Sequence, residues 1–336
     1  MTRSPKIVTI FGATGTQGGS VAQSLLQNKD FQVRAISRDP ESPRAQELER
    51  LGATIVKANG WNKDEITDAF KGSWGAFVNT NSDDPMFLDK QGPTEFDLGK
   101  TIVDALIAAD VKNLVYSSFV STREYTGGAI PMKSMDEKSR IEKYAVASGH
   151  FSTVGSIHAG WYMENYLNEE VAQVMGGFPF YADAEGYKTL YMPLWGKTRG
   201  TGIPWICIDD DFGDLVHGMF LDPKKYHQRP VPAISEILSW DEFARAFEKV
   251  TGEKARYVPI PAGETLAPGV SELDDHRELF RFGQATDGKY FGDLPGTTDI
   301  AATLKGAATL ARGKSESEAQ LTTAEKWFRS NYKAKA

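Results

Sequence analysis

One stretch near the start of the chain constrains the fold more than any other: an apolar run, closely spaced glycines and an amphipathic segment follow one another without a gap. Residues 7–11 are mostly apolar without alternation, which is typical of a strand buried on both faces. Gly12, Gly15 and Gly18 form a G-x-x-G-x-x-G pattern before a helical stripe over residues 21–26. Such a turn lets backbone N–H groups at a helix start bind a diphosphate. The alternative is a tight turn without a ligand.

The first half of the chain alternates short apolar runs with amphipathic segments. Strands are expected over residues 7–11, 31–36, 54–56, 76–78, 114–116 and 151–157, with helices that begin after Ser42 and Asn62 and at Glu95. Strands that recur with helices between them indicate βαβ units. We therefore predict an α/β fold with a doubly wound, mostly parallel Rossmann sheet, and a ligand at the carboxyl ends of its strands.

After about residue 158 this rhythm breaks. Residues 176–202 are rich in glycine, proline and aromatic residues, and we interpret them as loops and short strands over a pocket. Further along we expect a helix over 209–221 begun by three aspartates, a strand over 231–234, helices capped by Ser239 and Thr322, and a mobile polar segment over 305–317. The chain is thus divided into a dinucleotide-binding domain (1–157) and a smaller α/β substrate domain (158–336), partly interleaved with the sheet.

Charge and composition exclude several classes of protein. The net charge of −7 argues against a nucleic-acid-binding surface, which needs clustered lysine and arginine. No stretch approaches a membrane span and no secretory leader is visible. A single cysteine fits a reducing compartment. Cysteine pairs and H-E-x-x-H motifs are missing, so no metal site is expected. We expect a cytoplasmic protein, or a nuclear one if it is a regulator, of undetermined oligomeric state.

The end of the second predicted strand indicates which dinucleotide binds. NAD enzymes place a carboxylate there, about 20 residues after the glycines, to bind the ribose 2′-hydroxyl. Here Ser37 and Arg38 stand at that position. A guanidinium binds a 2′-phosphate through two parallel hydrogen bonds, which favours NADP(H). The alternative is that Arg38 is solvated and Asp39 binds the ribose.

The chain also resembles a known family, the NmrA-like proteins, which are atypical short-chain dehydrogenase/reductases. The resemblance lies in residues 12–21, 33–40, 77–81, 115–118, 136–144 and 161–167. It implies that the diphosphate is held by Gly12, Ala13, Thr14, Gly15, Thr16 and Gln17, and the 2′-phosphate by Arg38. It also implies that Asn59 and Gly60 flank the adenine, and that Thr80, Asn81, Lys138, Trp161 and Tyr162 lie near the nicotinamide ribose. Asn59 stands where family members often carry an acidic residue.

Two residues are candidates for catalysis. Ordinary short-chain reductases use a Tyr-x-x-x-Lys pair, but Tyr125 is followed at that offset by an alanine. Lys138 projects from the apolar face of a helix predicted over residues 134–148, which is costly unless it reaches a cleft or a partner such as Glu142. It would act as a general acid or only bind the cofactor ribose. Tyr125 lies on the preceding loop and is a candidate donor to the substrate.

Three functions remain open. The first is an NADP(H)-dependent oxidoreductase acting on a C=O, C=N or C=C bond of a mostly apolar metabolite, in line with fungal tailoring enzymes of secondary metabolism in the family. The second is a non-catalytic NADP(H) sensor that binds a protein partner, as the missing Tyr-x-x-x-Lys pair and family precedent suggest. The third is an NADP-assisted cyclase or isomerase. An open apolar space beside the nicotinamide would favour an enzyme.

Overall fold

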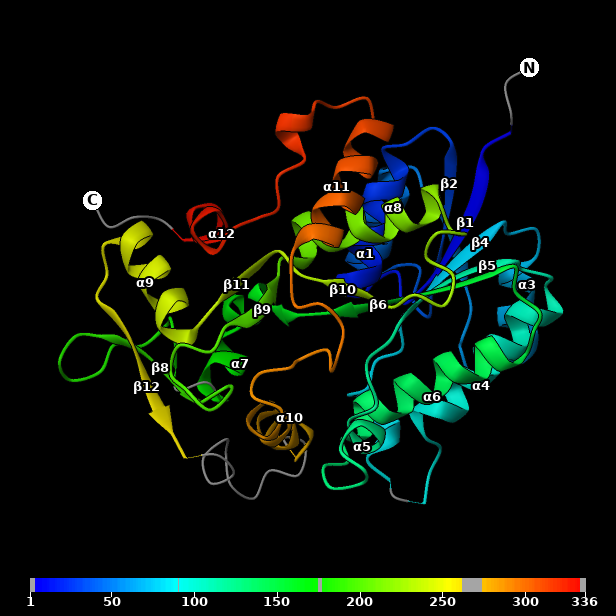
Figure 1. The fold of residues 1–336 in the computed structure, drawn as a ribbon. Coiled ribbons are helices and arrows are strands. Elements are labelled where there is room, and N and C mark those ends of the chain that lie inside the picture. The colour runs from blue at the N-terminus through cyan, green and yellow to red at the C-terminus, as the bar shows by residue number, and fades with distance from the viewer. Residues whose placement is uncertain (1–3, 90, 175–176, 262–273, 333–336) are drawn as a thin grey trace.

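The computed structural model describes residues 4–89, 91–174, 177–261 and 274–332. Its centre is a parallel sheet with the strand order β10-β6-β5-β4-β1-β2-β3 (Figure 1). The strands are β1 (Lys6–Phe11), β2 (Phe31–Ser37), β3 (Thr54–Lys57), β4 (Gly75–Val78), β5 (Asn113–Ser117), β6 (Thr153–Ala159) and β10 (Val231–Ala233). The chain winds from β1 first toward β3 and then back through β4 to β6, so the predicted doubly wound fold is confirmed.

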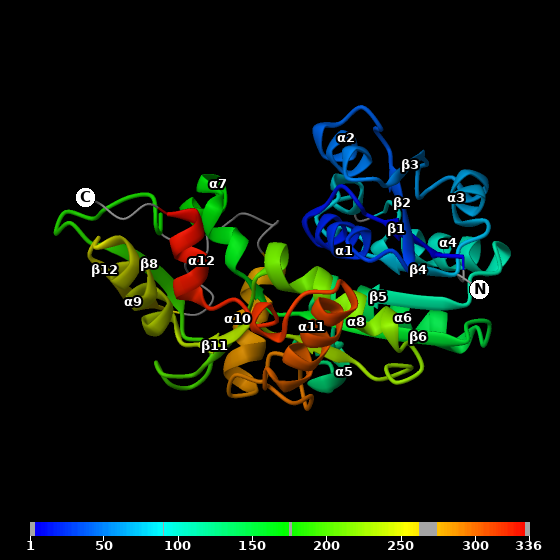
Figure 2. The ribbon, with the colours of Figure 1, turned by 90° about the horizontal axis from the view of Figure 1, so that it is seen from above.

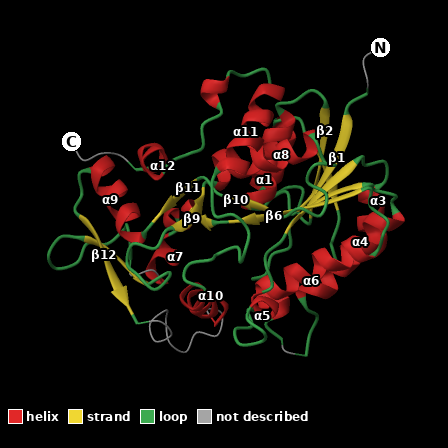
Figure 3. Ribbon diagram, in the orientation of Figure 1, coloured by secondary structure: helices red, strands yellow, loops and turns green. Residues whose placement is uncertain are grey.

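Helices cover both faces of this sheet (Figure 3). On one face lie α1 (Thr16–Leu26), α8 (Gly213–Leu221) and α11 (Asp299–Ala311), with α2 (Pro43–Arg50) beside them. On the other face lie α3 (Lys63–Phe70), α4 (Glu95–Ala108) and α6 (Lys133–Ala147). Two of these helices, α8 and α11, and the edge strand β10 come after residue 157. The second half of the chain therefore completes the layers that the first half begins.

The rest of the second half gathers at the end of the molecule away from β3 (Figure 2). It contains β7 (Trp161–Tyr162), β9 (Ile203–Ile206) and β11 (Glu236–Leu238) in one sheet, β8 (Lys188–Pro193) and β12 (Ala255–Ile260) in another, and the helices α7 (Glu169–Val174), α9 (Trp240–Thr251), α10 (Asp274–Ala285) and α12 (Ala324–Asn331). An aromatic core holds them together, with Trp205 stacked on Phe243 at a ring-centroid distance of 3.8 Å. Most aromatic residues of this half are core residues.

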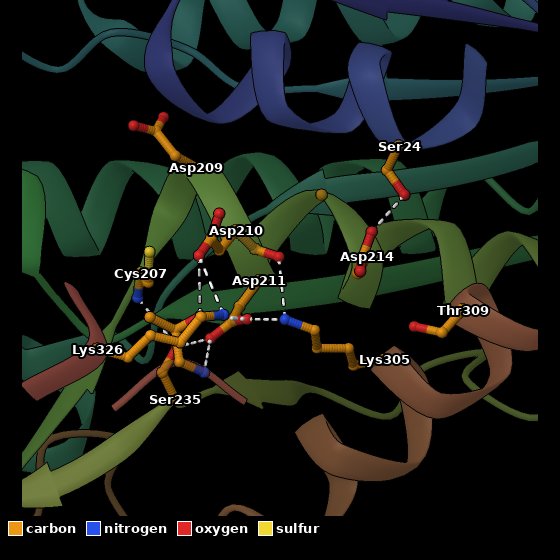
Figure 4. Close-up of polar contacts among 12 residues, drawn as sticks. Ser24, Cys207, Asp209, Asp210, Asp211, Asp214, Ser235, Lys305, Thr309 and Lys326 are labelled. Carbon is orange, nitrogen blue, oxygen red and sulfur yellow. Dashed lines mark hydrogen bonds and ion pairs between the residues drawn. The ribbon is translucent and has the colours of Figure 1, made fainter. Parts of the chain in front are cut away.

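The helix predicted over 209–221 is present as a π-helical turn (Ile208–Phe212) that runs directly into α8, with the three aspartates at its start. One of these aspartates is buried and contacts the end of the chain (Figure 4). Asp211 lies within this turn. It pairs with Lys305 and accepts hydrogen bonds from Ser235 Oγ and, at 2.9 Å, from Thr322 N. Lys305 thereby ties α11 to the turn that precedes α8, and residues 305–311, predicted to belong to a mobile segment, are helical. The final helix begins one residue later than expected, with Thr323 as its cap.

Candidate dinucleotide site

A cavity of about 730 Å³ opens at the carboxyl ends of the central strands. It lies where β1 has β2 on one side and β4 on the other, which is the point at which the strand order reverses. In doubly wound sheets ligands bind at this point, because the two connecting segments diverge and leave a crevice. Residues after all of β1, β2, β3, β4 and β5 line the wall, together with residues from the second half of the chain.

The glycine turn after β1 forms the middle of this wall. Gly12 has φ +79°, and a Cβ there would lie 2.8 Å from the carbonyl oxygen of Asn79. A Cβ on Gly18 would lie 2.2 Å from the carbonyl oxygen of Gly12, so glycine is needed for α1 to approach the turn. The first turn of α1 has no side-chain cap and no acidic residue. Its backbone N–H groups are thus arranged to bind an anion.

The predicted diphosphate contacts divide into two groups. Gly12, Thr14, Gly15, Thr16 and Gln17 line the cavity. Ala13 does not: its side chain is fully buried in the core on the α1 face of the sheet.

The end of the cavity beside β2 and β3 carries positive charge. Arg38, Asn59 and Gly60 line it, as the resemblance implies. Arg44, which sequence reasoning missed, also lines it and donates from Nη1 to the carbonyl oxygen of Thr14 at 3.0 Å. The only sequence signal for Arg44 was its place in the first turn of α2. The carboxylate of Asp39 instead accepts the backbone N–H of Glu41 at 3.0 Å within its own turn.

At the opposite end, Lys138 points from α6 to the end of β4. Its Nζ lies 2.6 Å from the carbonyl oxygen of Thr80, 3.1 Å from Thr80 Oγ1 and 2.8 Å from Glu95 Oε1. The Lys138 side chain is 9% exposed and that of Glu95 is 2% exposed. Asn79 Oδ1 lies at 3.4 Å as a further acceptor. An ammonium has three protons to donate, and protein acceptors are available for all of them. Thr80 and Asn81 also line the cavity, as expected.

The prediction that Glu142 is the partner of Lys138 is wrong. Glu142, one turn further along α6, faces the imidazole of His158 at 3.9 Å. Burial alone would raise the pKa of Glu142, but the nearby imidazole of His158 and the hydroxyls of Ser118 and Ser156 lower it. Glu95 takes the place expected of Glu142 because the start of α4 packs on α6. This pairing spans 43 residues of sequence, and no local spacing indicates it.

Trp161 and Tyr162 form the far wall, close to α1. The side-chain amide of Gln17 donates to the hydroxyl oxygen of Tyr162, which links the glycine turn to β7. Burial raises the pKa of Tyr162 to about 12, so the phenol is neutral. Beyond this pair the wall combines apolar and polar side chains: Phe119, Met132, Met135, Leu279 and Tyr290 alternate with Ser134, Asn165, Asp275 and His276.

The structure does not bring Tyr125 to the cavity. It lies in α5 (Thr122–Tyr125), and its hydroxyl donates to Asp293 at 2.8 Å. Residues 177–202, expected over the pocket, supply none of the lining residues either. Among the described residues, no three side chains of histidine, cysteine, aspartate or glutamate form a group that would hold a metal ion. Within the same residues, no helix is both long and apolar enough to cross a membrane.

A doubly wound sheet with a glycine turn and an anion-binding helix start at its reversal point defines a dinucleotide-binding protein of the Rossmann class. The sequence model of the NmrA-like family matches residues 4–290, and this chain belongs to that family.

Relatives and solved structures agree with this assignment. An NmrA-like family domain-containing oxidoreductase of Aspergillus campestris, cpsB, is 50% identical over 332 residues, with 98% of each chain covered. Another, FrzB of a Cladobotryum species, is 47% identical and covers 97% of this chain and 98% of its own. The negative transcriptional regulator NmrA in complex with NADP superposes with a TM-score of 0.69 at 21% identity, over 92% of this chain and 95% of that chain. Triphenylmethane reductase of a Citrobacter species with NADP(H) gives 0.66 at 14%, over 97% and 99%. At these identities the solved structures show the fold alone.

Proposed function

We propose that this protein is an NADP(H)-dependent oxidoreductase that reduces or oxidises a C=O, C=N or C=C bond of a mostly apolar metabolite, in a tailoring step of secondary metabolism. One observation carries the proposal: a single cavity runs from Arg38 past the glycine turn to Lys138 and continues between Met132 and Leu279. The first part suits a phosphorylated dinucleotide. The remainder, which offers both apolar side chains and a few polar groups, leaves room for a second ligand beside the nicotinamide end. The curated relatives described above are named oxidoreductases.

Each part of the wall has a role in this proposal. The backbone N–H groups around Gly15 bind the diphosphate, and Arg38 binds the 2′-phosphate. The nicotinamide, when bound, supplies or accepts hydride at its ring. Lys138 fixes the end of β4, beside which the nicotinamide ribose would bind, since Thr80 and Glu95 accept its protons. The residues beyond it exclude water from the reacting atoms.

Calorimetric titration of NADPH and NADH tests the cofactor assignment. We expect tighter binding of NADPH than of NADH. Arg38→Gln should weaken NADPH binding about 10- to 150-fold, because hydrogen bonds between charged groups contribute about 1.5–3 kcal/mol. It should change NADH less than about threefold, since NADH lacks the 2′-phosphate.

A matched control for this substitution is Arg50→Gln on α2. Arg50 is similarly exposed, with 71% against 75% for Arg38, but it lies outside the cavity wall. It should leave both affinities unchanged. Equal loss of NADPH and NADH affinity in Arg38→Gln, or wild-type binding that favours NADH, would contradict the assignment.

A further inference from the structure

The loop after β4 brings a carboxylate next to the guanidinium that we assign to the 2′-phosphate. Asp84 Oδ2 lies 3.6 Å from Arg38 Nη1, and both residues line the cavity. The Arg38 side chain is 75% exposed, whereas that of Asp84 is only 14% exposed. The carboxylate is therefore the fixed member of the pair, and the long arginine side chain reaches it from the end of β2.

The loop is built to hold Asp84 in this place. Asp84 Oδ1 accepts the backbone N–H of Met86 at 3.1 Å and so caps the 3-10 turn η1 (Pro85–Phe87). Phe87 is buried and packs edge-on against Trp61, which lines the same end of the cavity. Lys133 Nζ donates to the carbonyl oxygen of Phe87 at 2.7 Å, which ties the loop to the start of α6.

Other carboxylates of the described cavity wall are placed differently. Asp275 accepts the backbone N–H groups of Lys133 and Ser134, at 3.0 and 2.7 Å. Asp83 lies next to Asp84 in the chain but has no ion pair with Arg38 among the contacts described. Among these carboxylates, Asp84 is thus the one that contacts Arg38, the residue that we assign to the 2′-phosphate.

We propose that Asp84 reduces the preference of this site for NADPH over NADH. It does so by pairing with Arg38 beside the position of the ribose, where it weakens the binding of a 2′-phosphate. This inference rests on the proposed function, because it assumes that Arg38 meets the ribose. A 2′-phosphate must share the guanidinium with the carboxylate and lies within its repulsive field. A 2′-hydroxyl is not repelled and is able to donate to the carboxylate, as in NAD enzymes.

The test is the ratio of the dissociation constants for NADH and NADPH in Asp84→Asn. Asparagine keeps the oxygen that caps η1 and loses only the charge. We expect the ratio to rise about five- to tenfold over wild type, mainly through tighter NADPH binding, as removal of one nearby like charge predicts. The rise should shrink at 0.5 M salt, because added ions screen the repulsion.

Asp83→Asn is the matched control, since it removes the same charge one residue away on the same wall. It should shift both dinucleotides alike and leave the ratio unchanged. If Asp84→Asn does not fold, Asp84→Ser, which also caps a helical turn, replaces it with the same expected rise.

An unchanged ratio in Asp84→Asn, or an equal rise in Asp83→Asn, would overturn the role of Asp84. This outcome is separate from failure of the NADP(H) assignment, which is read from the wild-type ratio alone. A wild-type protein that favours NADH, with a ratio that still rises in Asp84→Asn, would support Asp84 as the selectivity residue and refute the NADP(H) preference.

Discussion

Lys138 shows how a single charged residue is made compatible with burial. An ammonium in a low-dielectric site needs a counter-charge and acceptors for its protons. Glu95 supplies the charge, and Thr80 supplies a carbonyl and a hydroxyl oxygen. The hydroxyl of Tyr116 lies 3.3 Å from Thr80 Oγ1 and extends this buried network into β5. Because the cation is already satisfied, its main effect is to fix the end of β4, where the nicotinamide ribose is proposed to bind.

The pairing predicts strongly non-additive effects on stability. Lys138→Met removes the counter-charge of the buried Glu95 carboxylate and leaves it with the Thr80 hydroxyl as its hydrogen-bond donor. It should lower the free energy of unfolding by about 3–5 kcal/mol. The double variant Lys138→Met/Glu95→Gln should recover at least half of that loss, because no unpaired charge remains. Denaturant unfolding of the two variants and the wild type measures both quantities.

An exposed ion pair on the same helix provides the comparison. Lys143 pairs with Glu124, and both side chains are more than half exposed. Lys143→Met should cost less than about 1 kcal/mol. A double variant at Lys138 and Glu95 that is less stable than Lys138→Met would contradict this view of the buried pair.

At the scale of elements, α1 is held in place by a buried polar contact with α8. His217 lies on α8 with Nδ1 3.0 Å from Ser24 Oγ and Nε2 2.9 Å from Asn28 Nδ2. The amide of Asn28 donates to Nε2, so the ring carries its proton on Nδ1. Ser24 Oγ in turn donates to Asp214, which pairs with Arg312 (Figure 4 shows Ser24 and Asp214). The helix whose first turn forms the anion cradle is thus fixed along its second half.

This contact predicts a pH dependence of stability. Burial lowers the pKa of His217 from 6.5 to about 4. Below pH 6.5 the unfolded chain binds a proton that the folded chain refuses, so stability falls as the pH falls from about 6.5 to 4. The loss attributable to this group is on the order of 3 kcal/mol. Urea unfolding of wild type and His217→Gln across this window should give a shallower slope for the variant; equal slopes would contradict the assignment.

Elements that are specified locally could be predicted, whereas elements fixed by distant partners could not. The strand β1, the cap at Asn62 and the capping box at Ser239 follow from neighbouring residues, and the structure has them. Residues 305–317 looked mobile because they are small and polar, but Lys305 is fixed by Asp211, which lies 94 residues earlier. Local composition carries no information about such a partner.

At the scale of the molecule, the site forms at the carboxyl ends of the central strands, where residues from the first and second halves of the chain meet. The glycine turn and Arg38 could be identified from sequence because a diphosphate and a 2′-phosphate demand local geometry and charge. Arg44 and Asp84 could not, since they reach the cavity only because the fold brings α2 and the loop after β4 to it. Glu95 could not either, since it reaches Lys138 only because α4 packs on α6. Membership of the NmrA-like family indicates the fold and the kind of cofactor. The proposed positions of the cofactor and of a second ligand rest on the cavity.

A crystal structure with NADPH bound tests the central claim most directly. We expect the 2′-phosphate at Arg38, the diphosphate at the start of α1 and the nicotinamide beside Thr80. One face of the nicotinamide ring should open into the space bounded by Met132 and Leu279. A dinucleotide bound elsewhere, or a nicotinamide with both faces covered by protein, would contradict it.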